Sequence, residues 1–545
     1  MLRTRALIRS LFCLTAMALI QVSASAAEPL HAQIDKLIES KAGGAVNAPC
    51  TDAEFVRRIY LDVAGRVPSV DEARAFLNDK AADKRQKLIG KLFDSVEFPR
   101  RLEELLNQTL MERRVGDDAE WSKFLRWACD TNQPWDKIAR TILDPNSEDE
   151  QTRGAAYFIT NRLDKVGQQD TDYPGLTRDV ARMFMGVDLQ CAQCHNHLFI
   201  EDYKQVDFQG LYTVYLNTAI RRDVKFPAVQ ENLLAKKTDF QSVFEQVPMS
   251  VGPRVPGMKE VEIPQFAKGE EYLVAPDKKT KAPGVPKFSP LEAVAERMAI
   301  ADNTAFNENL ANRLWYWMMG RGIVHPLDLR HSANPASHPE VLQLLTKEVV
   351  ARKYNMKDML KELALSKTYQ RSTVRKAGEN PAEDRYRVGI EKPIWAEQLL
   401  WSTLTAIGEG AKDVNPREMK DVADLRKKFV TVFSNPAKEP EVDFSPSVRA
   451  ALFLMNDSTV LGRLEPTGKN LVARLVAMKD AKQIADEVYL AVLTRAPTAE
   501  EYKDVEGFLA KVGVEGGKAD DAKKAKGLGM LAWALLTSTE FCLNH

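Results

Sequence analysis

The chain has 545 residues, and single hydrophobic cores stop growing near about 250–300 residues, so two or more domains are expected. Its 76 basic side chains balance its 76 acidic ones. That balance excludes a general attraction to nucleic acid or to an anionic membrane surface.

Residues 1–26 have the pattern of an export signal. Three arginines precede the apolar residues 11–22, and small residues at 24–26 form an A-x-A cleavage site. The apolar run is short for a bilayer span, and Cys13 lacks a lipoprotein box. No later segment has the length and apolarity of a membrane helix, so we expect no transmembrane anchor after cleavage. The expected location is the periplasm or the cell envelope, or secretion from the cell.

Helical periodicity dominates residues 28–216, the predicted N-terminal domain. Within it, Tyr60–Glu72 reads as a helix–turn–helix corner that ends in a capping box. The corner returns at Tyr489–Glu501 with its Tyr, Leu, Val, Arg, Pro and last Glu unchanged, and a Ser-x-Glu-Phe segment follows each copy. Convergent capping and an old duplication both remain open. We assign the corners a structural role and no chemistry.

The most informative segment is Cys191-Ala192-Gln193-Cys194-His195, a C-x-x-C-H motif. This motif is the attachment signature of a c-type haem, in which two thiols bind the haem covalently and the histidine is the proximal iron ligand. A helix ending at Gly186 and another starting near Asp207 flank the motif. We expect their apolar faces to sandwich one haem and to raise its reduction potential by excluding water.

Zinc is the competing interpretation, because Cys191, Cys194 and His197 could supply three ligands of a tetrahedral site. A structural zinc site usually brings a second close pair, and the sequence has no other C-x-x-C or H-x-x-x-H. A simple redox dithiol is the third possibility. The sixth iron ligand stays open, with Met183 and Met185 near in sequence.

The amino-acid composition changes over residues 217–287, where Pro, Lys, Val and Gly become frequent and helical periodicity is lost. We predict a linker or insert with room for a short hairpin. Residues 288–545 are again helical and form the predicted C-terminal domain. The predicted fold class is therefore mainly α: two helical domains joined by an irregular Pro/Lys-rich segment.

The motifs of both halves resemble the secreted proteins of planctomycetes and their relatives that pair the PSCyt-two and PSD-one domains, both of unknown function. The first domain is similar over Phe55–Asp62, Gly65–Pro68 and Gly186–His197. The second is similar over Asn312–Trp315, Gly320–Val324, Asn334–Pro339, Ser366–Tyr369 and Tyr489–Thr498.

This resemblance implies a cytochrome-like protein to which no reaction is firmly attached. It carries Cys191, Cys194 and His195 over as haem-binding positions. It keeps a metal-ligand role open for His197, and it makes His338 the first cross-domain candidate for the sixth ligand. One departure is Leu198, where the family more often has Pro or Lys.

The sequence thus favours one covalent haem c and electron transfer with a periplasmic redox partner whose identity it leaves unknown. The alternative is a non-redox, zinc-stabilised binding or scaffold protein of the envelope, linked to polysaccharide processing. A hydrolase is a third reading, but no nucleophile or base can be named for it, so we assign no catalytic residue. Cys50, Cys129 and Cys542 leave room for one disulfide of undetermined pairing.

Overall fold

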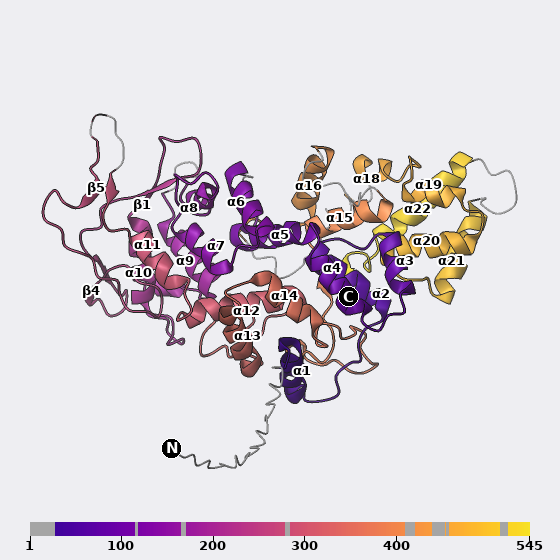
Figure 1. Ribbon diagram of the computed structural model, residues 1–545, viewed down its shortest axis with the longest axis horizontal. Helices are drawn as coiled ribbons and strands as arrows, with labels where there is room; N and C mark the ends of the chain where they lie inside the picture. The colour runs from indigo at the N-terminus through magenta and orange to yellow at the C-terminus, as the bar shows by residue number, and fades with distance from the viewer. Residues whose placement is uncertain are drawn as a thin grey trace, which may run out of the picture.

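The computed structural model describes residues 28–114, 118–164, 170–277, 279, 284–408, 420–438, 453, 457–512 and 521–545 (Figure 1). The expected export signal, residues 1–26, lies outside these ranges. The described chain is mainly helical and its sheets are all two-stranded, which confirms the predicted fold class. Within the described ranges, no helix is long and apolar enough to cross a membrane.

The N-terminal helices begin where the sequence supplies a capping side chain. Thr51, Asp118 and Asp172 each accept a hydrogen bond from a backbone N–H in the first turn. The elements are α1 (Leu30–Lys41), α2 (Asp52–Ile59), η1 (Tyr60–Ala64), α3 (Val70–Asn78), α4 (Lys84–Phe93), α5 (Glu97–Met111), α6 (Ala119–Asp130), α7 (Trp135–Leu143), η2 (Arg153–Ala156), α8 (Tyr157–Leu163), α9 (Tyr173–Met185), η3 (Cys191–Gln193) and α10 (Gln205–Leu216).

The segment predicted to be irregular contains three small antiparallel sheets instead of one hairpin. In the first two, Ala219 pairs with Gln230 and Phe240 pairs with Met249. The third has a shift in register between Tyr272 and Val274. The strands are β1 (Thr218–Ile220), β2 (Val229–Glu231), β3 (Thr238–Gln241), β4 (Pro248–Val251), β5 (Tyr272–Val274) and β6 (Val285–Pro286).

The C-terminal part returns to helices, with one further strand pair that joins β7 to the end of the chain. Its elements are α11 (Pro290–Met298), α12 (Thr304–Met319), α13 (Pro339–Ala351), α14 (Met356–Leu365), η4 (Glu383–Arg385), β7 (Lys392–Pro393), α15 (Ala396–Ile407), α16 (Lys420–Phe433), α18 (Ser458–Gly462), α19 (Leu471–Ala477), α20 (Ala481–Leu493), α21 (Ala499–Lys511), α22 (Asp521–Leu536) and β8 (Leu543–Asn544).

Two hydrophobic cores hold the molecule together, and each mixes residues from both halves of the sequence. The first runs from Leu30 through α9, α10 and α12 to Tyr386. The second combines α15–α22 with Leu61, Val67 and Val70 from the N-terminal part. Figure 1 shows this mixing, because α3 lies beside α20. The segment 217–287 therefore does not separate two independent cores.

The first helix–turn–helix corner is fixed by a network of ion pairs around one arginine. Ser69 and Glu72 form the expected capping box. Arg66 binds Glu72 at 2.8 Å and Glu97 at 2.5 Å. The same guanidinium lies over the ring of Tyr60, 5.2 Å from its centroid.

The second corner repeats this network atom for atom. Thr498 and Glu501 form the capping box. Arg495 binds Glu501 at 2.7 Å and Glu540 at 2.6 Å, and it lies 5.4 Å from the centroid of Tyr489. The Glu of each following Ser-x-Glu-Phe segment thus completes the network. This explains why Tyr and Arg recur together with the capping residues, and it agrees with the structural role assigned to both corners.

Candidate functional site

The C-x-x-C-H motif lies in the loop between α9 and α10. Helix α9 ends at Gly186, which has a left-handed φ of 67°. A Cβ at this position would lie 2.9 Å from Oδ1 of Asn309, so both the backbone conformation and the available space favour glycine. Cys191–Gln193 then form a single 3-10 turn, η3. The chain reaches the motif only a few residues after a firmly packed helix.

Partly buried ion pairs hold α9 in place. Arg182 binds Glu112 at 2.5 Å and Asp328 at 2.9 Å, and Asp179 binds Arg162 at 2.7 Å. Burial by itself would raise the pKa of Asp179, but neighbouring guanidinium groups, first that of Arg162, lower it to about 2. The helix that leads into the motif is therefore anchored to residues on both sides of the insert.

The apolar faces of α9 and α10 do not leave a slot beside the motif. Phe184 on α9 and Phe208 and Leu211 on α10 are 0–1 % exposed, and all three belong to the first core. The expected sandwich of a haem between these two faces is therefore not what the structure shows. Helices α9 and α10 contact each other directly, so their apolar faces are covered by other side chains of the protein.

Both motif cysteines are exposed free thiols. The backbone between them is held by polar contacts: Gln209 donates to the carbonyl of Gln193 at 3.0 Å, and the N–H of Val243 donates to the carbonyl of Cys194 at 3.1 Å. The other described cysteines, Cys50, Cys129 and Cys542, lie in or against the two cores. The structure thus shows no disulfide among the described cysteines.

The ring of His195 is prepared to ligate a metal through Nε2. Its Nδ1 lies 2.6 Å from the carbonyl oxygen of Asn196. A carbonyl oxygen only accepts hydrogen bonds, so Nδ1 carries the proton and the Nε2 lone pair is left for a ligand. A hydrogen bond from Nδ1 to a backbone carbonyl is the usual support for a metal-ligating histidine. The ring of Phe244 lies 4.7 Å away.

The ring of His197 has the opposite hydrogen-bond pattern. The backbone N–H groups of Phe199 and Ile200 donate to Nδ1 at 3.1 and 3.0 Å. Nδ1 is therefore an acceptor, and in the neutral ring the proton lies on Nε2. Neither nitrogen of this tautomer offers a free lone pair to a metal. The bonding pattern gives His197 a structural role as the acceptor that closes the turn after the motif.

A segment of the C-terminal part fastens the turn after the motif. Asp202 accepts hydrogen bonds from the N–H and the hydroxyl of Ser332, and the hydroxyl of Tyr203 donates to the carbonyl of Arg330 at 3.2 Å. The rings of Tyr203 and His331 lie 5.4 Å apart. The sequence did not indicate this cluster. No spacing pattern links two segments so far apart in the chain.

Burial lowers the pKa of His331, although the carboxylate of Asp202 opposes that shift and His197 adds to it. The neutral ring is therefore favoured where His331 packs on Tyr203. This histidine helps to hold the loop in the form that leaves both thiols exposed.

Exposed apolar side chains surround the motif: Leu198, Phe199, Val243 and Phe244. We call this group of side chains the apolar rim. They are 63, 86, 57 and 63 % exposed. Two come from the turn after the motif, and two come from the turn between β3 and β4 in the insert. Single exposed apolar residues are ordinary, but a group of this size beside two free thiols indicates a surface that a ligand or partner covers.

The other candidate ligands lie in different surroundings. His338 is 1 % exposed and packs on Tyr386, with Nδ1 facing the Ser337 hydroxyl at 3.3 Å. Burial lowers its pKa to about 4. Met183 is buried, and its sulfur accepts a contact from Arg162 at 3.3 Å. Across the described residues, no group of three or more His, Cys, Asp or Glu side chains is gathered in a geometry that could hold a metal ion.

Two family profiles match the chain, one on each side of the insert. Residues 33–219 match PSCyt2, a protein of unknown function (DUF1549). Residues 292–438 match PSD1, a protein of unknown function (DUF1553). No curated protein and no solved structure matches the chain.

Proposed function

Because the chain belongs to the proteins that pair the PSCyt2 and PSD1 domains, we propose that it is an exported c-type cytochrome-like protein that takes part in electron transfer. Cys191 and Cys194 would hold one haem through thioether bonds, and Nε2 of His195 would be the proximal ligand. A haem supplies a one-electron iron couple at such a site. The proposed location is the periplasm or cell envelope, and the partner would be a redox protein of that compartment.

The observation that carries this proposal is the combination of two exposed thiols in one turn with the free Nε2 of His195. The tautomer of His197 disfavours the zinc alternative, because it leaves only the two thiolates of the proposed ligand set in this loop. With His197 as an acceptor, the ligand set that the sequence suggested for zinc is incomplete in this loop.

The apolar rim provides the contact surface that a porphyrin face requires. Phe199 and Phe244 together leave roughly 300 Å² of ring surface uncovered, which is worth about 7 kcal/mol at 25 cal/mol per Å² if it is fully buried. That figure is an upper bound for the contribution of the two rings. Both motif thiols face solvent, and solvent stabilises the more charged ferric state, so we expect a lower reduction potential than a buried haem would have.

The test is covalent haem in the mature protein, produced in a host with cytochrome c maturation machinery. We expect a Soret band, iron, and a mass gain of about 616 Da that survives denaturation. Cys191→Ser and Cys194→Ser should each reduce or abolish the covalent product, whereas the matched control Cys542→Ser should keep it. Unmodified mass, two alkylatable motif thiols and one equivalent of zinc would refute the proposal and favour the zinc-stabilised scaffold protein.

A further inference from the structure

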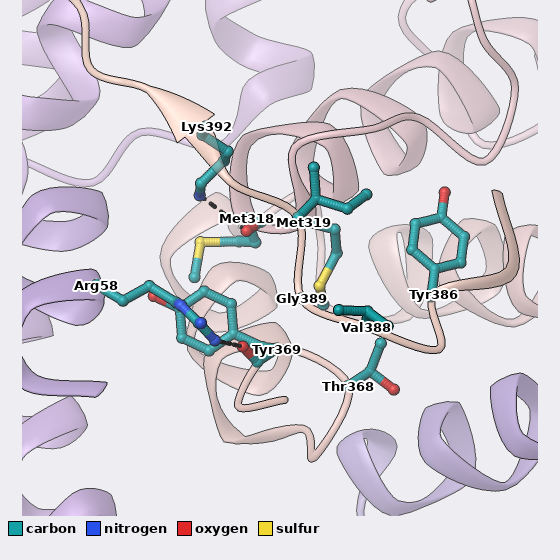
Figure 2. Close-up of a pocket in the computed structure, with 10 residues that line it drawn as sticks. Arg58, Met318, Met319, Thr368, Tyr369, Tyr386, Val388, Gly389 and Lys392 are labelled. Atoms are coloured by element: carbon teal, nitrogen blue, oxygen red, sulfur yellow. Dashed lines mark hydrogen bonds between the residues drawn. The ribbon is translucent and has the colours of Figure 1, made fainter. Parts of the chain in front are cut away.

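A cavity lies between the two cores, in a part of the molecule that the motif loop does not reach. Its volume is about 1090 Å³, including the space open to solvent. The walls come from α5, α12, β7, the start of α15 and the C-terminal strand β8. A smaller pocket shares Ile390 and Lys392 with it, and Figure 2 shows Lys392 in that pocket above Met318, with Arg58 and Tyr369 below.

In the inner wall of the cavity, one cation has only a long ion pair to a carboxylate that it shares. Lys392 is paired with Asp62 at 2.7 Å. Arg100 and Arg101 share the carboxylate of Glu104, which lies 2.8 Å from the first and 3.8 Å from the second. Arg100 makes a hydrogen bond to this carboxylate, whereas the longer ion pair of Arg101 is the weaker of the two.

Two buried polar side chains of this wall also have atoms without a hydrogen-bond partner. Arg101 is 5 % exposed, and neither its Nε nor its Nη1 has an acceptor. Asn544 is 2 % exposed; its Nδ2 donates to Asp62, but its Oδ1 has no donor. Leaving a buried polar group unpaired is costly, and such groups are uncommon in native proteins. The cavity thus presents an anion-binding group and a separate hydrogen-bond acceptor.

Aromatic rings supply the third feature of the cavity. The guanidinium of Arg101 lies over the ring of Trp395, with its Cζ 4.9 Å from the ring centroid, and this contact orients the guanidinium. Tyr316 and Trp317 line the cavity from α12 and are only half-buried. Half-buried aromatic rings offer flat faces on which a ring-shaped ligand can stack.

We propose that this cavity binds a sugar acid, which is a ring with one carboxylate and several hydroxyl groups. The carboxylate would pair with Arg101, a hydroxyl would donate to Oδ1 of Asn544, and a ring face would stack on Trp317. A charge-assisted pair with a buried guanidinium is strong and directional. A neutral sugar would leave Arg101 unpaired. An aromatic acid would leave Asn544 unpaired.

The proposal is independent of haem attachment, so each can fail without the other. Calorimetric titration of the full mature chain with glucuronate should give saturable binding with a Kd of about 1 mM or tighter, the affinity expected for a ligand of this size. Glucose, which lacks the carboxylate, should bind at least about tenfold more weakly. Benzoate, which lacks the hydroxyl groups, should also bind more weakly.

Variants connect this binding to the cavity. Arg101→Gln should weaken glucuronate at least about tenfold and leave glucose unchanged, whereas the exposed control Arg222→Gln should change neither. If Arg101→Gln does not fold, Glu391, an exposed residue that lines the cavity, provides a second test. Glu391→Gln removes a like charge from the cavity mouth and should tighten glucuronate binding but not glucose binding.

No saturable glucuronate binding would overturn the proposal. So would equal binding of glucose and glucuronate, because the carboxylate would then contribute nothing. Stronger binding of benzoate than of glucuronate would identify an aromatic-acid cavity and overturn the sugar assignment. Glucuronate binding that neither variant alters would place the ligand elsewhere on the protein.

Discussion

Two substitutions of His197 separate a structural role from a metal-ligand role. Asn places its Oδ1 where the histidine has Nδ1, so His197→Asn keeps an acceptor for the backbone N–H groups of Phe199 and Ile200 but removes Nε2. His197→Ala removes both. If the residue serves as an acceptor, the Asn variant should resemble the parent protein and the Ala variant should not.

The structure sets the size of the effect. A neutral hydrogen bond contributes about 1 kcal/mol net. Phe199 is highly exposed, so water can replace its bond, whereas the half-buried Ile200 has less access to water. Together the two bonds should be worth about 1–2 kcal/mol for keeping the turn closed. In His197→Ala, hydrogen exchange in residues 198–203 should therefore accelerate roughly 5–30-fold.

Exchange measured by mass spectrometry on peptides of this turn is the assay, with haem content of the same samples as the second readout. His197→Asn should show exchange near that of the parent protein, and both variants should keep covalent haem. Loss of bound metal or haem in a folded His197→Asn protein would refute the tautomer argument, because only Nε2 has been removed. Unchanged exchange in His197→Ala would show that the two hydrogen bonds do not close the turn.

Three further predictions concern stability and thiol chemistry. Arg66→Met should lower the free energy of unfolding by roughly 3 kcal/mol and Arg495→Met by about 1–2 kcal/mol, because the guanidinium of Arg66 is 12 % exposed and that of Arg495 is 26 % exposed. Equal losses of unfolding free energy for the two variants in denaturant titrations would contradict this. Burial alone would raise the pKa of Glu397, but ion pairing, chiefly with Arg113, lowers the pKa to about 2, which is below its value of about 4.3 in the unfolded chain. The contribution of Glu397 to the free energy of unfolding is therefore complete above about pH 5 and is lost as the pH falls towards 2. Glu397→Gln should thus be less stable at pH 7, and the gap in unfolding free energy should close in acid; a gap independent of pH would show that the carboxylate is not ionised in the native state. In haem-free protein the two motif thiols should react with iodoacetamide in native buffer, whereas Cys50 and Cys129 should react only after unfolding; peptide mapping checks this, and early labelling of the buried pair would contradict the cores described.

Local features of the fold could be predicted from the sequence because they depend on short-range interactions. The capping boxes at Ser69 and Thr498 form as expected, since each joins residues three apart in the chain. Gly186 ends α9 for a similarly local reason. The number of strands in the insert was not predictable, because its two- to four-residue strands are too short to show a period of two.

The candidate site was predicted only in part. The sequence identified Cys191, Cys194 and His195 by their spacing, and their role as haem ligands stays a prediction. It could not assign the tautomers of His195 and His197, which depend on whether a carbonyl or an N–H group faces each ring. The sequence also could not show that the apolar faces of α9 and α10 are buried in the first core.

The sequence by itself determined the helical class, the two corners and the C-x-x-C-H motif, because each depends on residues close together along the chain. Only the tertiary structure decided which groups surround that motif and which charges stay unpaired. Asp202 accepts a hydrogen bond from Ser332 across more than a hundred residues of chain, and Asp62 accepts one from Asn544 across more than four hundred. Such contacts are set by how the helices pack, and no local pattern in the sequence records them.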